Sequence, residues 1–65
     1  MIKVKINNKD EQLTEGTTVS VLLKSRRVKK AAVWINGRQL LSAEYETYIV
    51  KDADEIRILR LIAGG

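Results

Sequence analysis

The chain has 65 residues, enough for one small domain and near the lower limit for folding without disulfides or metal ions. It contains no cysteine and no histidine, which excludes disulfides, thiol nucleophiles, zinc sites built from those residues and histidine general bases. Hydrophobic residues make up 45% of the sequence, and no apolar run approaches the length of a membrane span. Lys3 and Lys5 interrupt the early apolar residues, so we recognise no signal peptide and expect a cytoplasmic domain that binds no metal.

The net charge of +4 arises from one basic stretch. Residues 24–30 contain five cations and no acid: Lys24, Arg26, Arg27, Lys29 and Lys30. The chain has 12 Lys and Arg, so seven remain elsewhere against eight Asp and Glu, and the rest is nearly neutral. Two interpretations are open. The cations follow a helix whose dipole favours positive charge at its C-terminus, or they form an electrostatic docking patch for an acidic protein surface or, less readily, nucleic acid.

Residues 1–6 alternate strictly between the two faces of a strand. One face carries aliphatic side chains and the other carries lysines: Ile2, Val4 and Ile6 against Lys3 and Lys5. Turn-forming residues 7–10 favour a hairpin, and residues 11–14 are predicted to return as a short second strand with Leu13 in the core.

A helix is predicted from Val19 to about Arg26. Thr18 is a suitable N-cap, and Val19, Leu22 and Leu23 follow at helical spacing. The glutamate or glutamine of a full capping box is missing three residues after Thr18.

The second half of the chain is predicted to form strands around one tight turn. A third strand covers 31–36 and ends in Asn36-Gly37, a strong signal for a tight turn. A short return over 38–41, a helical turn over 42–47, a turn at 50–54 and a last strand over 55–61 follow. The order ββαββ predicts an α+β fold: a mixed sheet of four to five strands with one main helix on one face.

We expect the first and last strands to lie together in the middle of this sheet. The core then combines nine aliphatic residues: Ile2, Val4, Ile6, Leu22, Leu23, Val33, Ile35, Ile56 and Ile58. The alternation turns another set toward the opposite face: Lys3, Lys5, Trp34, Arg57, Leu59 and Leu61. An exposed face with Trp34 and Leu59 among cations is typical of a partner-binding surface. In the alternative, inverted register, Trp34 is a core residue. Tyr45 and Tyr48 are expected to be structural.

The chain stops on Gly64-Gly65, its one candidate reactive feature. Two glycines without side chains fit a narrow channel, and the tip carries a bare α-carboxylate. Adenylation by a partner would convert this carboxylate into a reactive anhydride. The alternative interpretation is an ordinary frayed terminus.

Four stretches resemble the ubiquitin-like β-grasp sulfur carriers. They are Glu15-Gly16-Thr17-Thr18-Val19-x-x-Leu22-Leu23, Val33-x-Ile35-Asn36-Gly37, Asp52-Ala53-Asp54-x-Ile56-x-Ile58 and the terminal Gly64-Gly65. Together they cover nearly the whole chain in the family's order. Among these carriers the chain most resembles those of thiamine biosynthesis and, more distantly, the small subunit of molybdopterin synthase.

The resemblance implies that the chain is a protein cosubstrate and not an enzyme. Residues 1–61 would form the β-grasp domain and 62–65 a flexible reactive tail, with Gly65 as the covalent centre and Gly64 beside it. An E1-like adenylyltransferase would activate the terminal carboxylate with ATP and Mg²⁺, and no cofactor would be bound by the chain itself. Sulfur from a cysteine desulfurase or another donor would give a thiocarboxylate for thiazole synthase or another acceptor. Ile62 and Ala63 would join the partner-binding residues.

Two positions depart from the family's pattern. Ala53 replaces the usual glycine of an Asp-Gly-Asp turn, which predicts a different backbone geometry there. The basic stretch 24–30 contrasts with thiamine carriers that are commonly more acidic.

Three other functions are left open by the residues. The carrier could serve molybdopterin, cysteine or homocysteine synthesis or tRNA thiolation. A ubiquitin-like modifier would use the same terminal glycine. A small RNA-binding module would use residues 24–30, although it would have few aromatic residues for base stacking.

Overall fold

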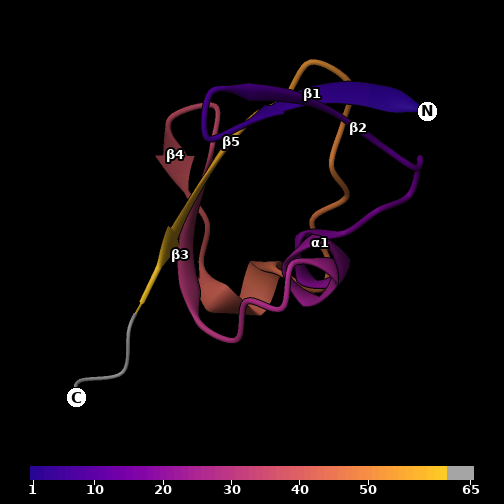
Figure 1. Ribbon diagram of the computed structural model, residues 1–65. Coiled ribbons are helices and arrows are strands. Elements are labelled where there is room, and N and C mark those ends of the chain that lie inside the picture. Colours follow the sequence, from indigo (N-terminus) through magenta and orange to yellow (C-terminus); the bar gives the residue numbers. More distant parts are fainter. Residues whose placement is uncertain (62–65) are drawn as a thin grey trace.

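The computed structural model describes residues 1–61, which form one mixed sheet packed against one α-helix (Figure 1). The elements are β1 (Ile2–Ile6), β2 (Lys9–Leu13), α1 (Val19–Ser25), β3 (Ala31–Ile35), β4 (Arg38–Gln39), the 3₁₀ turn η1 (Ser42–Glu44) and β5 (Glu55–Arg60). The predicted α+β class is confirmed. The proposed tail, with Ile62, Ala63, Gly64 and Gly65, lies outside the described residues.

The five strands are arranged in the order β2-β1-β5-β3-β4. As predicted, the first and last strands are neighbours in the middle of the sheet, and they run parallel, with Ile6 opposite Ile56. Helix α1 lies between β2 and β3 in the chain and packs on one face of the sheet. Among the described residues the opposite face carries no helix (Figure 1). Within the described residues, no helix is both long enough and apolar enough to cross a bilayer.

The β1–β2 hairpin is tighter than predicted. Asn7 and Asn8 have φ values of 50° and 68°, and this left-handed pair is typical of the two-residue turns that match strand twist. Lys9 therefore already pairs with Ile6, and β2 begins two residues before the predicted start at Glu11. The prediction had assigned Lys9 and Asp10 to the turn, which was wrong.

Helix α1 is capped at both ends. The Thr18 hydroxyl accepts a hydrogen bond from the Val21 N–H at 3.2 Å, as predicted for an N-cap. At the other end the Val28 N–H donates to the Leu23 carbonyl at 3.0 Å, which closes a Schellman-type end around Arg27. Arg27 has a φ of 58°, a conformation that glycine adopts without strain.

The core lies between α1 and the covered face of the sheet. Its buried hydrophobic members are Ile2, Val4, Ile6, Val19, Leu22, Leu23, Ala31, Val33, Ile35, Leu40, Val50 and Ile56. Each large aliphatic side chain contributes about 1.5–3 kcal/mol through burial, before the cost of chain entropy. Of the nine predicted core residues only Ile58 is not fully buried; it packs against the edge of the cluster.

Ala53 has a φ of 71°. This left-handed value is one that glycine adopts without strain and a residue with a Cβ adopts less readily. The turn is held by β1, because the Ala53 N–H donates to the Lys3 carbonyl at 2.7 Å and the Lys3 N–H donates to the Asp52 carboxylate at 2.8 Å. Alanine is therefore kept in a conformation that costs about 1–2 kcal/mol for a residue with a Cβ.

We predict that Ala53→Gly stabilises the domain. Relief of the left-handed strain outweighs the entropy that glycine adds to the unfolded chain, so the free energy of unfolding should rise by about 0.5–1 kcal/mol. Urea unfolding followed by circular dichroism measures the change. Ala43→Gly, at an exposed position in η1, is the control and should lower stability. A loss of stability in Ala53→Gly would contradict the strain argument.

Candidate functional site

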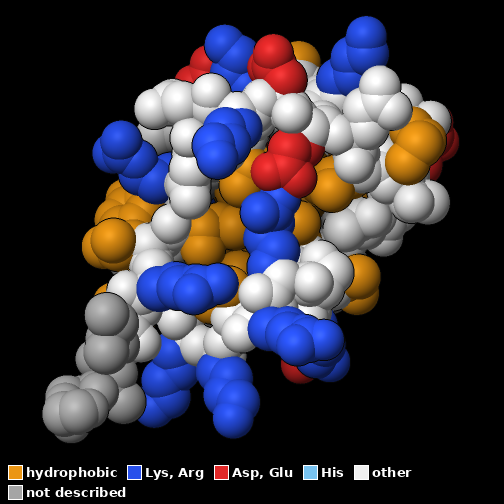
Figure 2. All heavy atoms as spheres, in the orientation of Figure 1, with side chains coloured by type: hydrophobic (Ala, Val, Ile, Leu, Met, Phe, Trp, Pro, Cys, Tyr) orange, Lys and Arg blue, Asp and Glu red, His pale blue; other side chains and the backbone are white. Residues whose placement is uncertain are grey.

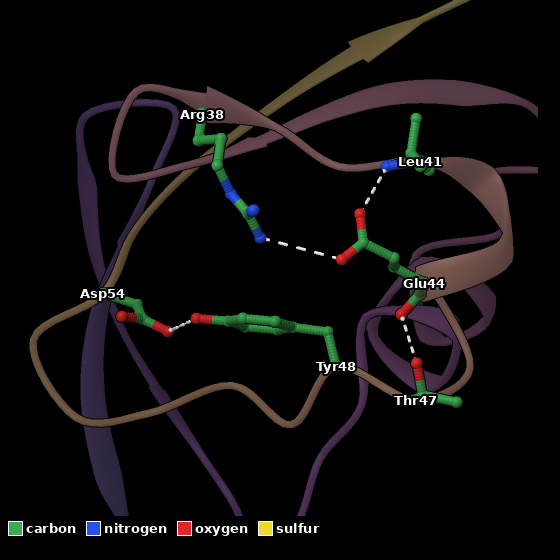
Figure 3. Close-up of polar contacts among 6 residues, drawn as sticks. All are labelled: Arg38, Leu41, Glu44, Thr47, Tyr48 and Asp54. Atoms are coloured by element: carbon green, nitrogen blue, oxygen red, sulfur yellow. Dashed lines mark hydrogen bonds and ion pairs between the residues drawn. The ribbon is translucent and has the colours of Figure 1, made fainter.

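A buried carboxylate fixes the beginning of β5 (Figure 3). Asp54 is only 6% exposed, and its side chain accepts three hydrogen bonds. The donors are the Asn36 amide at 3.0 Å, the Tyr48 hydroxyl at 2.8 Å and the Lys51 N–H at 2.9 Å. The Asn36 donor comes from the β3–β4 turn, and the other two come from the loop between η1 and β5 that also contains Asp54, so one side chain joins two loops.

Two asparagine side chains also bind the backbone of β5. The Asn36 carbonyl oxygen accepts from the Glu55 N–H at 2.9 Å. The Asn7 side chain accepts from the Ile58 N–H at 2.8 Å and donates to the Ile58 carbonyl at 3.2 Å. Because β1 ends at Ile6, Asn7 takes the place of a continued strand beside Ile58. The first four residues of β5 are thus held from both neighbouring turns.

The two tyrosines are structural, as predicted. The Tyr45 hydroxyl donates to the Ala31 carbonyl at 2.8 Å, and both rings pack against the core. Burial raises the pKa of Tyr48 to about 12, and its hydrogen bond to Asp54 and the charge of that carboxylate act in the same direction. The Arg38 charge opposes the shift. Arg38 itself pairs with Glu44 at 3.6 Å (Figure 3).

The raised Tyr48 pKa predicts a specific alkaline behaviour. The unfolded phenol ionises near pH 10 and the folded one near pH 12, so this contribution to stability is complete below pH 10 and is lost as the pH rises through 12. Tyr48→Phe should be less stable than the unaltered chain by about 1 kcal/mol at pH 7, because Asp54 loses a donor. The two stabilities should converge between pH 10 and 12.

Urea unfolding at a series of pH values measures this convergence. Lysine deprotonation affects both proteins alike and cancels in the difference. A constant difference from pH 8 to pH 12 would show that Tyr48 does not couple to stability in this way.

The face of the sheet opposite α1 carries the predicted partner-binding residues. In β3 the buried Val33 and Ile35 flank Trp34, which therefore lies on the helix-free face. This excludes the inverted register in which Trp34 is a core residue. The side chain is half-buried, because it lies opposite Arg57 on β5. Lys3 and Lys5 on β1 are exposed on the same face, as predicted.

An apolar strip runs along this face toward the end of β5. Leu59 is 56% exposed and lies opposite the small Ala32, and Leu61, just beyond the strand, is 54% exposed. At the other end of the strip a shallow hollow of about 320 Å³ is lined by Trp34, Arg57 and Lys5, among others. The structure therefore gathers all the predicted surface residues up to Leu61 on or beside one face.

The basic stretch divides into residues with different surroundings. Arg26 is half-buried and forms an ion pair with Glu11, which ties the end of α1 to β2. Lys24 lies in the last turn of α1, where the helix dipole favours a cation. The other three cations of the stretch are exposed and lie beyond the helix: Arg27, Lys29 and Lys30.

The exposed basic loop borders the end of β5. The Leu61 N–H donates to the Lys30 carbonyl at 3.1 Å, and Arg60 pairs with Ala31 in the sheet. Figure 2 shows Lys and Arg side chains gathered at the end of the molecule where the described chain stops. Sequence reasoning treated the basic stretch and the end of the last strand separately and missed Arg60, although that residue directly precedes Leu61.

Among residues 1–61, no group of three or more Asp and Glu side chains is placed to hold a metal ion. The described residues instead present an apolar strip bordered by cations, and the described chain ends beside it.

Comparison with known proteins identifies the family of this chain. The model of the ThiS family matches residues 4–65, which include the final Gly64-Gly65. The chain belongs to the ThiS family. This membership confirms the predicted relationship to the thiamine-type sulfur carriers.

Solved structures support the same family and its ubiquitin-like β-grasp fold. A crystal structure of a thiamine biosynthesis protein (ThiS) from Geobacter metallireducens matches with a TM-score of 0.81 and 26% identity, covering 98% of this chain and 100% of that one. A solution structure of a thiamine biosynthesis protein from the same organism matches with a TM-score of 0.80 and 26% identity, covering 98% and 88% of the two chains. A search of curated proteins gives no significant match.

Proposed function

We propose that this ThiS-family chain is a sulfur carrier in thiamine biosynthesis, with Gly65 as the group that carries the sulfur. The observation that carries the proposal is the family match over residues 4–65, which extends through the terminal Gly64-Gly65. The two structural relatives are thiamine biosynthesis proteins, which favours thiazole formation as the step that receives the sulfur.

The chemistry takes place at the terminal carboxylate. Carboxylates are poor electrophiles, so an E1-like adenylyltransferase would first use ATP and Mg²⁺ to form an acyl adenylate on Gly65. The persulfide of a cysteine desulfurase would then displace AMP to give an acyl disulfide, which a thiol reduces to a thiocarboxylate as a disulfide forms, whereas a sulfide donor would displace AMP and give the thiocarboxylate directly. The chain binds neither ATP nor metal itself, and the need for ATP favours a cytoplasmic location. It acts as a cosubstrate and performs no catalysis.

The described domain suits this task because it holds β5 firmly and releases the chain beside a binding face. Asp54, Asn36 and Asn7 fix the first part of the strand. Four residues follow Leu61, and when extended they would span about 13 Å, enough to enter a partner's active site. Residues 62–65 would act as the reactive tail, and Ile62 and Ala63 would line the partner's channel with it.

We assign docking of the enzymes to the helix-free face. Trp34, Leu59 and Leu61 supply apolar contact area, and exposed cations border them: Lys3, Lys5 and Arg57. Apolar side chains surrounded by polar ones are typical of the central contacts in protein interfaces.

Extension of the chain by one alanine after Gly65 should abolish thiocarboxylate formation. The added residue turns the Gly65 carboxylate into a peptide bond, and the new terminal carboxylate lies one residue too far along and carries a methyl group that a channel fitted to two glycines excludes. Intact-mass spectrometry after incubation with the adenylyltransferase, ATP and a sulfur donor should show exchange of one oxygen for sulfur in the unaltered chain only. Circular dichroism should show both proteins folded.

The same mass spectra separate the carrier from a ubiquitin-like modifier. Adducts in which the chain is joined to lysines of other proteins would indicate a modifier. Sulfur gain by the extended chain would contradict the assignment to Gly65.

Leu59→Ser should weaken binding to the adenylyltransferase by about 1–2 kcal/mol, since a central apolar contact is lost. Its effect on folding should be small, because Leu59 is already 56% exposed. Leu41→Ser is a matched control at a residue that is 70% exposed and outside this face. Isothermal calorimetry measures both affinities, and equal affinities would exclude Leu59 from the interface.

A further inference from the structure

Four exposed cations lie on the two segments that adjoin where the chain leaves the sheet: Arg27, Lys29, Lys30 and Arg60, here called the cationic collar. The two segments that form it are joined by the hydrogen bond from the Leu61 N–H to the Lys30 carbonyl at 3.1 Å. The pairing of Ala31 with Arg60 continues this connection into the sheet. Arg27 and Arg60 are 33 positions apart in the sequence, and these contacts place their segments at the same end of the molecule.

The fold does not account for these charges. Within residues 1–61 the ion pairs are Arg26–Glu11 and Arg38–Glu44, and neither includes a residue of the collar. The helix dipole acts mainly within the last turn, which holds Lys24 but ends before the collar. Arg27 has a left-handed φ of 58°, which glycine adopts more readily than arginine. Like charges placed together repel one another and cost stability when no partner compensates them.

We propose that the cationic collar docks on an acidic protein surface that surrounds the opening through which the adenylyltransferase receives the chain's terminus. This inference rests on the proposed function and adds the means by which the enzyme selects and orients this carrier. Any enzyme that takes Gly65 into its active site must pass the end of β5, and its rim then meets Lys29, Lys30 and Arg60. A negative rim attracts the collar before the terminus enters.

A protein partner fits the collar better than nucleic acid does. Single-stranded nucleic acid binding typically combines cations with aromatic side chains on which bases stack. The collar segments 27–31 and 60–61 contain no aromatic residue. Electrostatic docking of a protein needs only complementary charge and acts mainly on the rate of encounter.

The test uses charge reversal at the collar, Lys29→Glu with Lys30→Glu. Their backbone contacts stay intact, and both side chains are exposed. The control, Lys9→Glu with Lys51→Glu, changes the net charge equally at the opposite end of β5. Lys9 pairs with Ile6, which pairs with Ile56 near the start of that strand, and Lys51 lies in the turn before it. Thermal unfolding checks that both variants are folded.

Adenylation of each protein by the adenylyltransferase of the same organism is followed by pyrophosphate release. At low salt the collar variant should raise KM about tenfold with kcat unchanged, whereas the control changes KM less than about twofold. At about 1 M salt, where charges are screened beyond about 3 Å, the KM values should converge. Lys29→Gln with Lys30→Gln provides a milder variant with a smaller effect of the same sign.

The outcomes separate the two proposals. If the unaltered chain is adenylated and the collar variants have its KM at low salt, the collar proposal is overturned and the sulfur-carrier function stands. If the unaltered chain is not adenylated at all, both fail. If the collar variants lose binding to a labelled single-stranded RNA that the unaltered chain binds, with KM for adenylation unchanged, the collar binds nucleic acid and the proposal is also overturned.

Discussion

The buried carboxylate of Asp54 is the interaction on which the arrangement of this domain depends. It accepts hydrogen bonds from the β3–β4 turn and from two residues of its own loop between η1 and β5. Burial of a carboxylate without hydrogen-bond donors destabilises the folded state, so the stability of the fold depends on these three donors. Through Asp54 the β3–β4 turn, the segment with Tyr48 and the turn with Lys51 come together at the beginning of β5. These hydrogen bonds fix the position of the first residues of β5, whereas the far end of the strand is exposed.

The two ends of β5 have contrasting surroundings. The first residues lie between β1 and β3 and are held by side chains from both adjacent turns, Asn36 and Asn7. The last residues expose Leu59, and the chain then continues past Leu61 beside the basic loop. A strand that is held at one end and open at the other delivers a terminus in a defined direction. This combination suits the proposed role, in which the chemistry takes place at the C-terminus.

The basic stretch shows how one run of similar residues serves several purposes. Arg26 pairs with Glu11 and Lys24 matches the helix dipole, which agrees with the structural interpretation of the run. The remaining exposed cations agree with the interpretation as a docking patch. The structural interpretation therefore holds for Arg26 and Lys24, and the docking interpretation stays a proposal for the exposed cations.

Much of this protein follows from the sequence by itself, because its local signals agree with the fold. Alternation in residues 1–6, the Thr18 cap and the Asn36-Gly37 turn each predicted the element that is observed. The motifs also led to the family. The early start of β2 was missed, because only the left-handed pair Asn7 and Asn8 shows that Lys9 belongs to a strand.

Only the tertiary structure decided which residues far apart in the chain are in contact. Nothing local indicates that Asn7 would bind Ile58, that Asp54 would bind Asn36 of the β3–β4 turn, or that the Lys30 carbonyl would bind the Leu61 N–H. Periodicity reports which face of an element is buried, but not which loops meet at its ends. Those meetings depend on the order and direction of strands in the sheet, and they place the cations of residues 27–30 beside the end of β5.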